Sequence, residues 1–144
     1  FGPYVESFLR TILGSGMPQG YRIVYVLFYF AAIVVSSLVT LFKHKDNAWY
    51  NAVGASGAVS AVLFFFIFFK PWELIYFYGI LPVPGIIMGV IYLVYSQYMS
   101  RREADNINHD AHLTGALFGF IFPVLLNYHL VQYFITELLN FSFR

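Results

Sequence analysis

The sequence predicts an all-α polytopic membrane protein, because long uncharged stretches alternate with short polar segments. Of the 144 residues, 60% are hydrophobic and only 10% are charged, whereas a soluble domain carries about 25% charged residues. So few polar side chains cannot cover a globule in water. The composition therefore predicts a single membrane domain over residues 1–144, with the lipid bilayer as its surroundings.

Net charge and residue usage exclude several other functions. The formal net charge is +1, which gives no indication of nucleic-acid binding. The chain has no cysteine, which excludes a disulfide, a thiolate metal site and a thiol nucleophile within it. It begins without a methionine and without a basic segment followed by an apolar core. We therefore expect it to be part of a longer protein and to have no cleaved signal peptide.

Four apolar segments are expected to form transmembrane helices, namely residues 21–42, 54–69, 81–99 and 111–126. The first is long enough to cross a hydrocarbon core of about 30 Å at 1.5 Å per residue. The second is short, which is tolerable if its start lies in a water-filled cavity of the protein. The third has Pro82 and Pro84 in its expected first turn.

Two further helices are expected at the ends of the chain. Residues 1–20 should form a short helix followed by a loop, because the run from Gly14 to Gly20 is rich in glycine and also contains proline. Residues 129–143 should form an amphipathic helix or an extension of the last span. Lysine and arginine are divided evenly between the two expected sides, so the positive-inside rule gives no orientation.

Two short motifs introduce polar side chains at the starts of apolar spans. Gly54-Ala55-Ser56-Gly57 opens the second expected span, and His109-Asp110-Ala111-His112 opens the fourth. An ionisable residue inside a membrane span is costly, and it is by default a functional-site hypothesis. A serine and a histidine placed in this way indicate a nucleophile, Ser56, and its general base, His112.

Small residues make one face of each of these two spans smooth. In the second span Gly57 is followed by Ser60 and Ala61 at helical spacing, and in the fourth span His112 is followed by Gly115 and Gly119. Small residues allow membrane helices to approach closely. If the two helices pack side by side on these faces, the serine hydroxyl and the imidazole can meet.

Other interpretations of the same residues are possible. A serine at a helix start is usually a cap, and a glycine pair four residues apart is usually a packing motif. Asp110 points to a different side of the helix from His112, which makes it a poor third member of a triad. His109 and His112 have the spacing of half a metal site, but no third or fourth ligand can be identified, so neither metal nor cofactor is expected.

The paired motifs resemble those of the rhomboid family of intramembrane serine proteases. The resemblance rests on Gly54-Ala55-Ser56-Gly57 together with Ala111-His112-Leu113-Thr114-Gly115-Ala116, and it covers the last four of the usual six core helices. It implies a rhomboid-like helix bundle in which Ser56 is the nucleophile and His112 the base, without a carboxylate. It also implies single-span membrane proteins as substrates and a location in the cell (inner) membrane.

The expected oxyanion site consists of the backbone N–H groups of Ala55 and Ser56, at the positive end of a helix dipole. The family also has a His-x-x-x-Asn pattern in its first two helices, which these 144 residues do not contain. Four residues after the serine the family often has an aromatic residue that packs on the histidine, whereas this chain has Ser60. The span 81–99 is the implied lateral gate for substrates, and the loop before His112 is the implied lid.

Two other functions fit parts of the sequence. A rhomboid-like protein could be catalytically weak or inactive and bind transmembrane helices without cleaving them. A transporter or channel fragment is the weaker alternative. Its polar residues should line a path through the full thickness of the membrane, and here they gather near one side.

Overall fold

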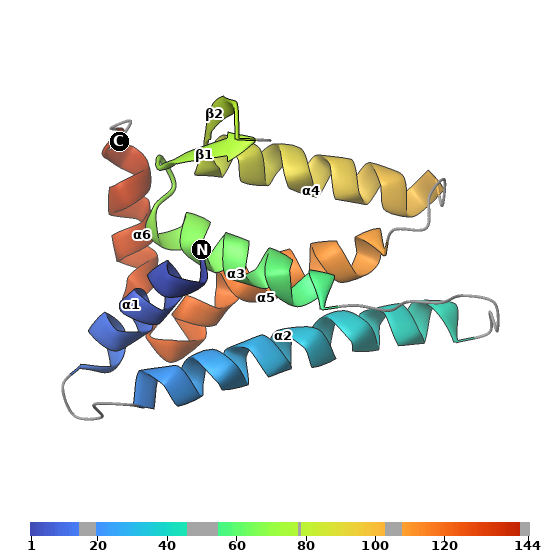
Figure 1. The fold of residues 1–144 in the computed structure, drawn as a ribbon, viewed down its shortest axis with the longest axis horizontal. Coiled ribbons are helices and arrows are strands. Elements are labelled where there is room, and N and C mark those ends of the chain that lie inside the picture. The colour runs from blue at the N-terminus through green and yellow to red at the C-terminus, as the bar shows by residue number, and fades with distance from the viewer. Residues whose placement is uncertain (15–19, 46–54, 78, 103–107, 142–144) are drawn as a thin grey trace.

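The computed structural model describes residues 1–14, 20–45, 55–77, 79–102 and 108–141 (Figure 1). In these residues the chain forms six helices and two short strands. In chain order they are α1 (Gly2–Leu13), α2 (Gly20–His44), α3 (Ser56–Phe69), β1 (Leu74–Phe77), β2 (Leu81–Pro84), α4 (Gly85–Arg102), α5 (His109–Leu126) and α6 (Leu130–Leu139).

Helix α3 is the central element of the bundle. Eleven of its 14 residues are buried, and it contacts α1, α2, α4, α5 and α6. In Figure 1, α3 and α5 lie between the long α2 and α4, while α1 and α6 gather at one end. At 1.5 Å per residue α3 is about 21 Å long, less than a bilayer core. A helix this short is tolerated because its neighbours surround it.

Phenylalanine rings fill the space around α3. Phe28 of α2 lies against Phe65 of α3 and Phe122 of α5, with ring centroids 5.4 and 4.6 Å apart. Phe68 of α3 stacks on Phe134 of α6 at 5.0 Å. Buried aromatic pairs at these separations contribute favourable ring contacts in addition to the burial of apolar area. The core is therefore held together by rings from four helices.

The segment from Leu74 to Pro84 departs from the all-α prediction. Strands β1 and β2 form an antiparallel hairpin in which Ile75 pairs with Val83, and Gly79 in the turn has a φ of 73°. Pro82 and Pro84 therefore lie in a strand and not in the first turn of a helix. Every second residue of an edge strand points its N–H away from its partner, so two prolines spaced in this way fit without losing ladder hydrogen bonds.

The other helices lie close to the expected ranges. Helix α2 begins one residue before and ends two residues after the range 21–42, and α5 begins two residues before the range 111–126. Helix α4 begins at Gly85, four residues later than expected, because of the hairpin. Helix α6 covers the middle of the range 129–143. Residues 15–19 and 54 are outside the described residues.

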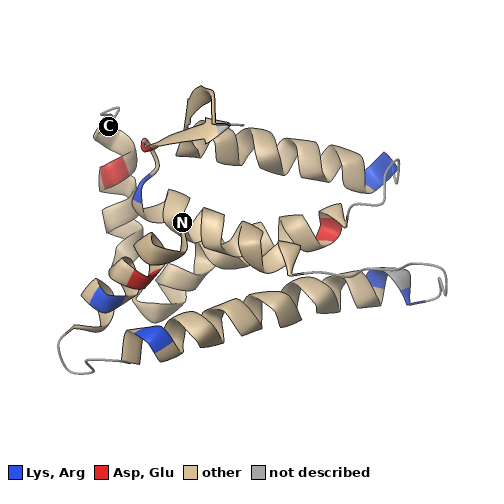
Figure 2. Cartoon of the chain, viewed as in Figure 1, with Lys and Arg blue, Asp and Glu red and all other residues tan. Residues whose placement is uncertain are grey.

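The surface of the bundle is that of a membrane protein. Charged residues lie near the two ends of the long axis, and the middle of the helices carries none (Figure 2). Large apolar side chains are exposed along α2, among them Ile23, Leu27 and Phe30. Among the described helices, Gly20–Lys43 and His109–Leu126 are long and apolar enough to cross a membrane. Such an exposed apolar belt is stable only in contact with lipid or further apolar protein.

Candidate active site

Helices α3 and α5 touch through their backbones. A Cβ atom added to Gly115 would collide with the carbonyl group of Gly57, and one added to Gly119 would collide with the backbone of Ala61. A Cβ added to Gly57 would lie 2.9 Å from the carbonyl oxygen of Ala111 and would overlap the side chain of Ser36. Only glycine fits at these three positions, so the small residues set the distance between the two helices.

Ser56 is the first residue of α3, and Ala55 is the residue that caps it. The Ser56 side chain is exposed and is not in the capping position. The carbonyl oxygen of Ala55 accepts a hydrogen bond from the N–H of Val59 at 3.1 Å. The first N–H groups of a helix have no partner within it, and they carry the positive end of the helix dipole. Gly54, the first residue of the motif, is outside the described residues.

His112 lies in the first turn of α5 and is half-buried. Asn108 caps this helix, because its side-chain oxygen accepts a hydrogen bond from the N–H of Ala111 at 3.0 Å. The Asn108 side chain also donates to the hydroxyl of Thr40 on α2 at 2.9 Å. The turn that carries the candidate base is thus fixed both by its own cap and by a neighbouring helix.

The contact between Gly57 and Ala111 brings the two candidate catalytic residues into one region. Ser56 is the chain neighbour of Gly57, and His112 is the chain neighbour of Ala111. Gly57 and Gly115 are in direct backbone contact, and Gly115 is three residues beyond His112. The first turns of α3 and α5 therefore lie side by side, with a serine on one and a histidine on the other.

Two further residues, Ser60 and Tyr92, complete this region. The Oγ atom of Ser60 lies 2.6 Å from the Oη atom of Tyr92 on α4, and it donates to the carbonyl oxygen of Ser56 at 3.2 Å. The Tyr92 ring stacks on the His112 ring, with centroids 6.2 Å apart and planes inclined by 30°. The sequence alone does not single out Tyr92, because the same helix also carries the hydroxyl groups of Tyr95, Ser96 and Tyr98.

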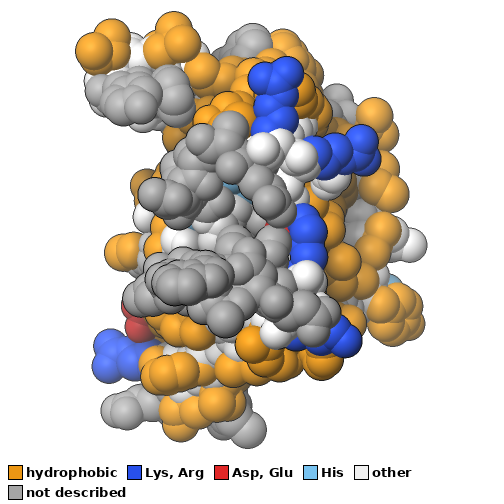
Figure 3. Space-filling view, turned by 90° about the vertical axis from the view of Figure 1, so that its right-hand side faces the viewer, with side chains coloured by type: hydrophobic (Ala, Val, Ile, Leu, Met, Phe, Trp, Pro, Cys, Tyr) orange, Lys and Arg blue, Asp and Glu red, His pale blue; other side chains and the backbone are white. Residues whose placement is uncertain are grey.

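Asp110 belongs to a charged cluster that joins three helices. Its carboxylate accepts hydrogen bonds from the Lys43 ammonium of α2 at 2.7 Å and from the Ser100 hydroxyl of α4 at 2.5 Å. A carboxylate in the first turn of a helix is also favoured by the helix dipole. Figure 3 looks onto this end of the molecule and shows several basic side chains on it. Asp110 thus joins α5 to its neighbours.

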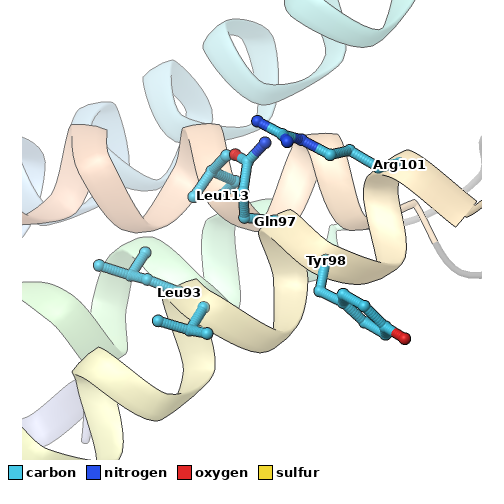
Figure 4. A pocket seen from close by; sticks show the side chains of 6 residues that line it. Leu93, Gln97, Tyr98, Arg101 and Leu113 are labelled. Atoms are coloured by element: carbon cyan, nitrogen blue, oxygen red, sulfur yellow. The ribbon is translucent and has the colours of Figure 1, made fainter.

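An open groove of about 480 Å³ lies between α4 and α5 (Figure 4). Its apolar lining is Leu93, Val94 and Leu113, the residue after His112. In Figure 4, Gln97 and Arg101 extend from α4 toward Leu113, whereas Tyr98 points away from it. The groove therefore offers an apolar surface with polar groups at the end where the charged cluster lies.

Comparison with known proteins identifies the family of the chain. The family model described as Rhomboid domain matches residues 12–129. The chain belongs to the rhomboid family. This family has a polytopic helical membrane fold and includes serine proteases.

One relative of this rhomboid domain is RHOMBOID-like protein 12, mitochondrial, from Arabidopsis thaliana. It is 38% identical over 73 residues, which cover 50% of this chain and 21% of the relative. The match thus spans about a fifth of the relative's length. No solved structure matches this chain.

Proposed function

We propose that this rhomboid domain is an intramembrane serine endopeptidase that cleaves single-span membrane proteins. Ser56 is the nucleophile and His112 is its general base. The observation that supports this proposal is the backbone contact of Gly57 with Ala111 and Gly115. It places the helix turn that carries the serine against the helix turn that carries the histidine. No acidic residue is needed in this dyad, since Asp110 is bound to Lys43 and Ser100.

The reaction follows from the two side chains. His112 takes the hydroxyl proton while the Ser56 oxygen attacks the carbonyl carbon of a substrate peptide bond. The tetrahedral anion that forms then collapses, the C–N bond breaks, and the leaving amine takes the proton from His112. Water next attacks the serine ester with His112 again as the base. This second step releases the new carboxyl end and restores the Ser56 hydroxyl.

The start of α3 supplies stabilisation for the negative charge of the tetrahedral anion. We propose that the N–H groups of Ala55 and Ser56 donate to the oxyanion, because the first N–H groups of a helix are not used within it. The positive end of the helix dipole acts in the same direction. The loss of one donor of this kind lowers a rate by about 10²–10³.

Cleavage within a membrane also requires that the substrate helix unwinds locally and that it enters the enzyme from the side. A peptide bond inside a substrate helix is shielded by the helical hydrogen bonds, so the helix must unwind locally before Ser56 can attack. The substrate must also enter from the side, and α4, whose outer face is apolar, is the proposed lateral gate. In this proposal, α2, α3, α4 and α5 are the four transmembrane helices of a multi-pass protein.

A serine-reactive fluorophosphonate provides the direct test. The purified protein in detergent should be labelled at Ser56, and Ser56→Ala should lose both labelling and cleavage of a reconstituted single-span substrate. The matched control is Ser37→Ala, which removes the hydroxyl of an exposed serine on α2. If the protein binds the substrate helix but is not labelled at Ser56 and does not cleave the substrate, it is instead a non-catalytic membrane-helix binder.

A further inference from the structure

We infer that Tyr92 is a positioning residue for His112, and that Ser60 joins it to the helix turn that carries Ser56. This inference rests on the proposed function, in which His112 is the base. It concerns a residue on α4, a helix that contributes neither member of the dyad. Tyr92 would act through His112 and would not touch the reacting atoms.

The ring of Tyr92 on α4 lies beside the ring of His112 on α5. The Tyr92 and His112 centroids are 6.2 Å apart, and the planes are inclined by only 30°. A histidine side chain turns about two torsions, and a flat ring beside the imidazole limits that rotation. Because a displacement of about 1 Å in a catalytic group can cost about 10² in rate, a restraint on this ring bears directly on the turnover rate.

A hydrogen bond to Ser60 holds the tyrosine at its hydroxyl group. The single proton of the Ser60 hydroxyl goes to the carbonyl oxygen of Ser56, at 3.2 Å. With its proton donated to this carbonyl, Ser60 accepts from the tyrosine hydroxyl in the 2.6 Å contact between Ser60 and Tyr92, a contact in which either oxygen can donate. Ser60 is buried, and its hydroxyl thus links the Tyr92 ring to the backbone of the nucleophile itself.

Two tyrosine–histidine contacts fix the register of α4 beside α5. Tyr92 and Tyr95 are three residues apart on α4, and His112 and His109 are three residues apart on α5. Tyr95 lies edge-on to His109 with centroids 5.7 Å apart, which repeats the tyrosine–histidine contact one turn away. Tyr92 also lies 5.7 Å from Phe64 of α3. Tyr92 thus contacts Ser60 and Phe64 of α3 and His112 of α5.

Ser60 lies one turn after Ser56 on α3, and its small side chain leaves room for the Tyr92 ring from α4.

The main test compares two tyrosine-to-leucine variants in the membrane-reconstituted protein. Tyr92→Leu keeps an apolar side chain near Phe64 but removes the ring beside His112. We expect kcat to fall by about 10- to 100-fold, with KM unchanged and with slower fluorophosphonate labelling of Ser56. Tyr95→Leu is the matched control. Tyr95 lies on the same helix as Tyr92, but its ring contacts His109, whereas the ring of Tyr92 contacts His112. The control variant should keep kcat within about threefold, in line with a surface substitution.

A double-mutant cycle tests the hydrogen bond separately. Tyr92→Phe and Ser60→Ala remove the same bond from its two ends, and each should lower kcat by about two- to tenfold, the range of one neutral hydrogen bond. The double variant should be no slower than either single variant. If Tyr92→Leu folds and keeps the kcat of the parent protein, or if the two effects multiply, the inference is wrong. If Ser56→Ala still cleaves, the proposed function itself has failed.

Discussion

The backbone of Gly115 packs directly on the carbonyl group of Gly57, with no side chain between α3 and α5 at this point. Since Ser56 precedes Gly57 and His112 lies one turn before Gly115, this contact sets the separation of the candidate nucleophile and base. Protein interiors are close-packed and do not deform continuously. The addition of one methyl group at the contact should therefore change both the free energy of unfolding and the turnover rate.

The first prediction is that Gly115→Ala lowers stability and activity together. Its Cβ would collide with backbone atoms of Gly57, which cannot rotate away. Overpacking of this kind costs about 1–3 kcal/mol of the free energy of unfolding, and kcat should fall at least about tenfold because the helices must separate. Thermal unfolding in detergent and cleavage of a reconstituted substrate measure the two effects.

Gly89→Ala is the matched control for this prediction. Both substitutions exchange glycine for alanine inside a helix and gain the same helix propensity, about 1 kcal/mol. At Gly89 the added Cβ would lie 3.3 Å from the end of the Ile67 side chain and 3.4 Å from the Phe64 ring, and both can shift. If the two alanine variants behaved alike, the backbone contact would not be what holds the site.

The second prediction separates a structural from a catalytic role for Asp110. In a triad, replacement of the acid by its amide lowers kcat by about 10⁴. Here the carboxylate binds Lys43 and Ser100, so Asp110→Asn should change kcat by no more than about fivefold. Because the Lys43 side chain is 43% exposed, the loss of stability should be only about 0–1 kcal/mol and should shrink in high salt.

His112→Ala is the reference variant for this comparison, and it should lose essentially all cleavage. Asp110→Asn should retain fluorophosphonate labelling at Ser56. A kcat for Asp110→Asn as low as that of His112→Ala, with the fold intact, would show that Asp110 does assist the base.

Much of the fold could be predicted from the chain because apolar periodicity and small residues are local signals. The smooth faces at Gly57 and Gly115 predicted which two helices approach closely. The hairpin at residues 74–84 could not be predicted in the same way, since Pro82 and Pro84 fit both the first turn of a helix and an edge strand. The choice depends on the pairing with Leu74–Phe77, which is a tertiary contact.

The surroundings of His112 were predictable only in part. The two motifs identify Ser56 and His112 by residue type and position along the chain. Tyr92 comes from a third helix, 20 residues before His112 in the sequence, and nothing local to α4 shows that its ring faces an imidazole. Similarly, the sequence shows that Asp110 and His112 face different sides of a helix, but it does not show that Lys43 and Ser100 bind the carboxylate.

The third prediction concerns the groove between α4 and α5. If substrates enter beside α4, a larger side chain in the groove should obstruct them. We expect Leu93→Trp to raise KM for the reconstituted substrate several-fold, with little change in kcat or in labelling of Ser56 by a small fluorophosphonate. Ile87→Trp, at an exposed position of α4 outside the groove lining, is the control. Equal KM values for the two variants would exclude this entry route.

The fourth prediction concerns the cap of α5, on which the place of His112 depends. Asn108→Ala removes the acceptor for the Ala111 N–H and the bond to Thr40, and it should lower the free energy of unfolding by about 0.5–2 kcal/mol. Asn108→Asp loses the bond donated to Thr40 but keeps the oxygen that accepts from the Ala111 N–H and can accept from the Thr40 hydroxyl, so it should retain most of the stability. Turnover should follow the same order, because fraying would displace His112 together with the first turn of α5, which packs on Gly57 through Ala111. Thermal unfolding and kcat of the two variants, measured in the same lipid, test this order. An alanine variant as stable and as active as the aspartate variant would show that the cap does not position the base.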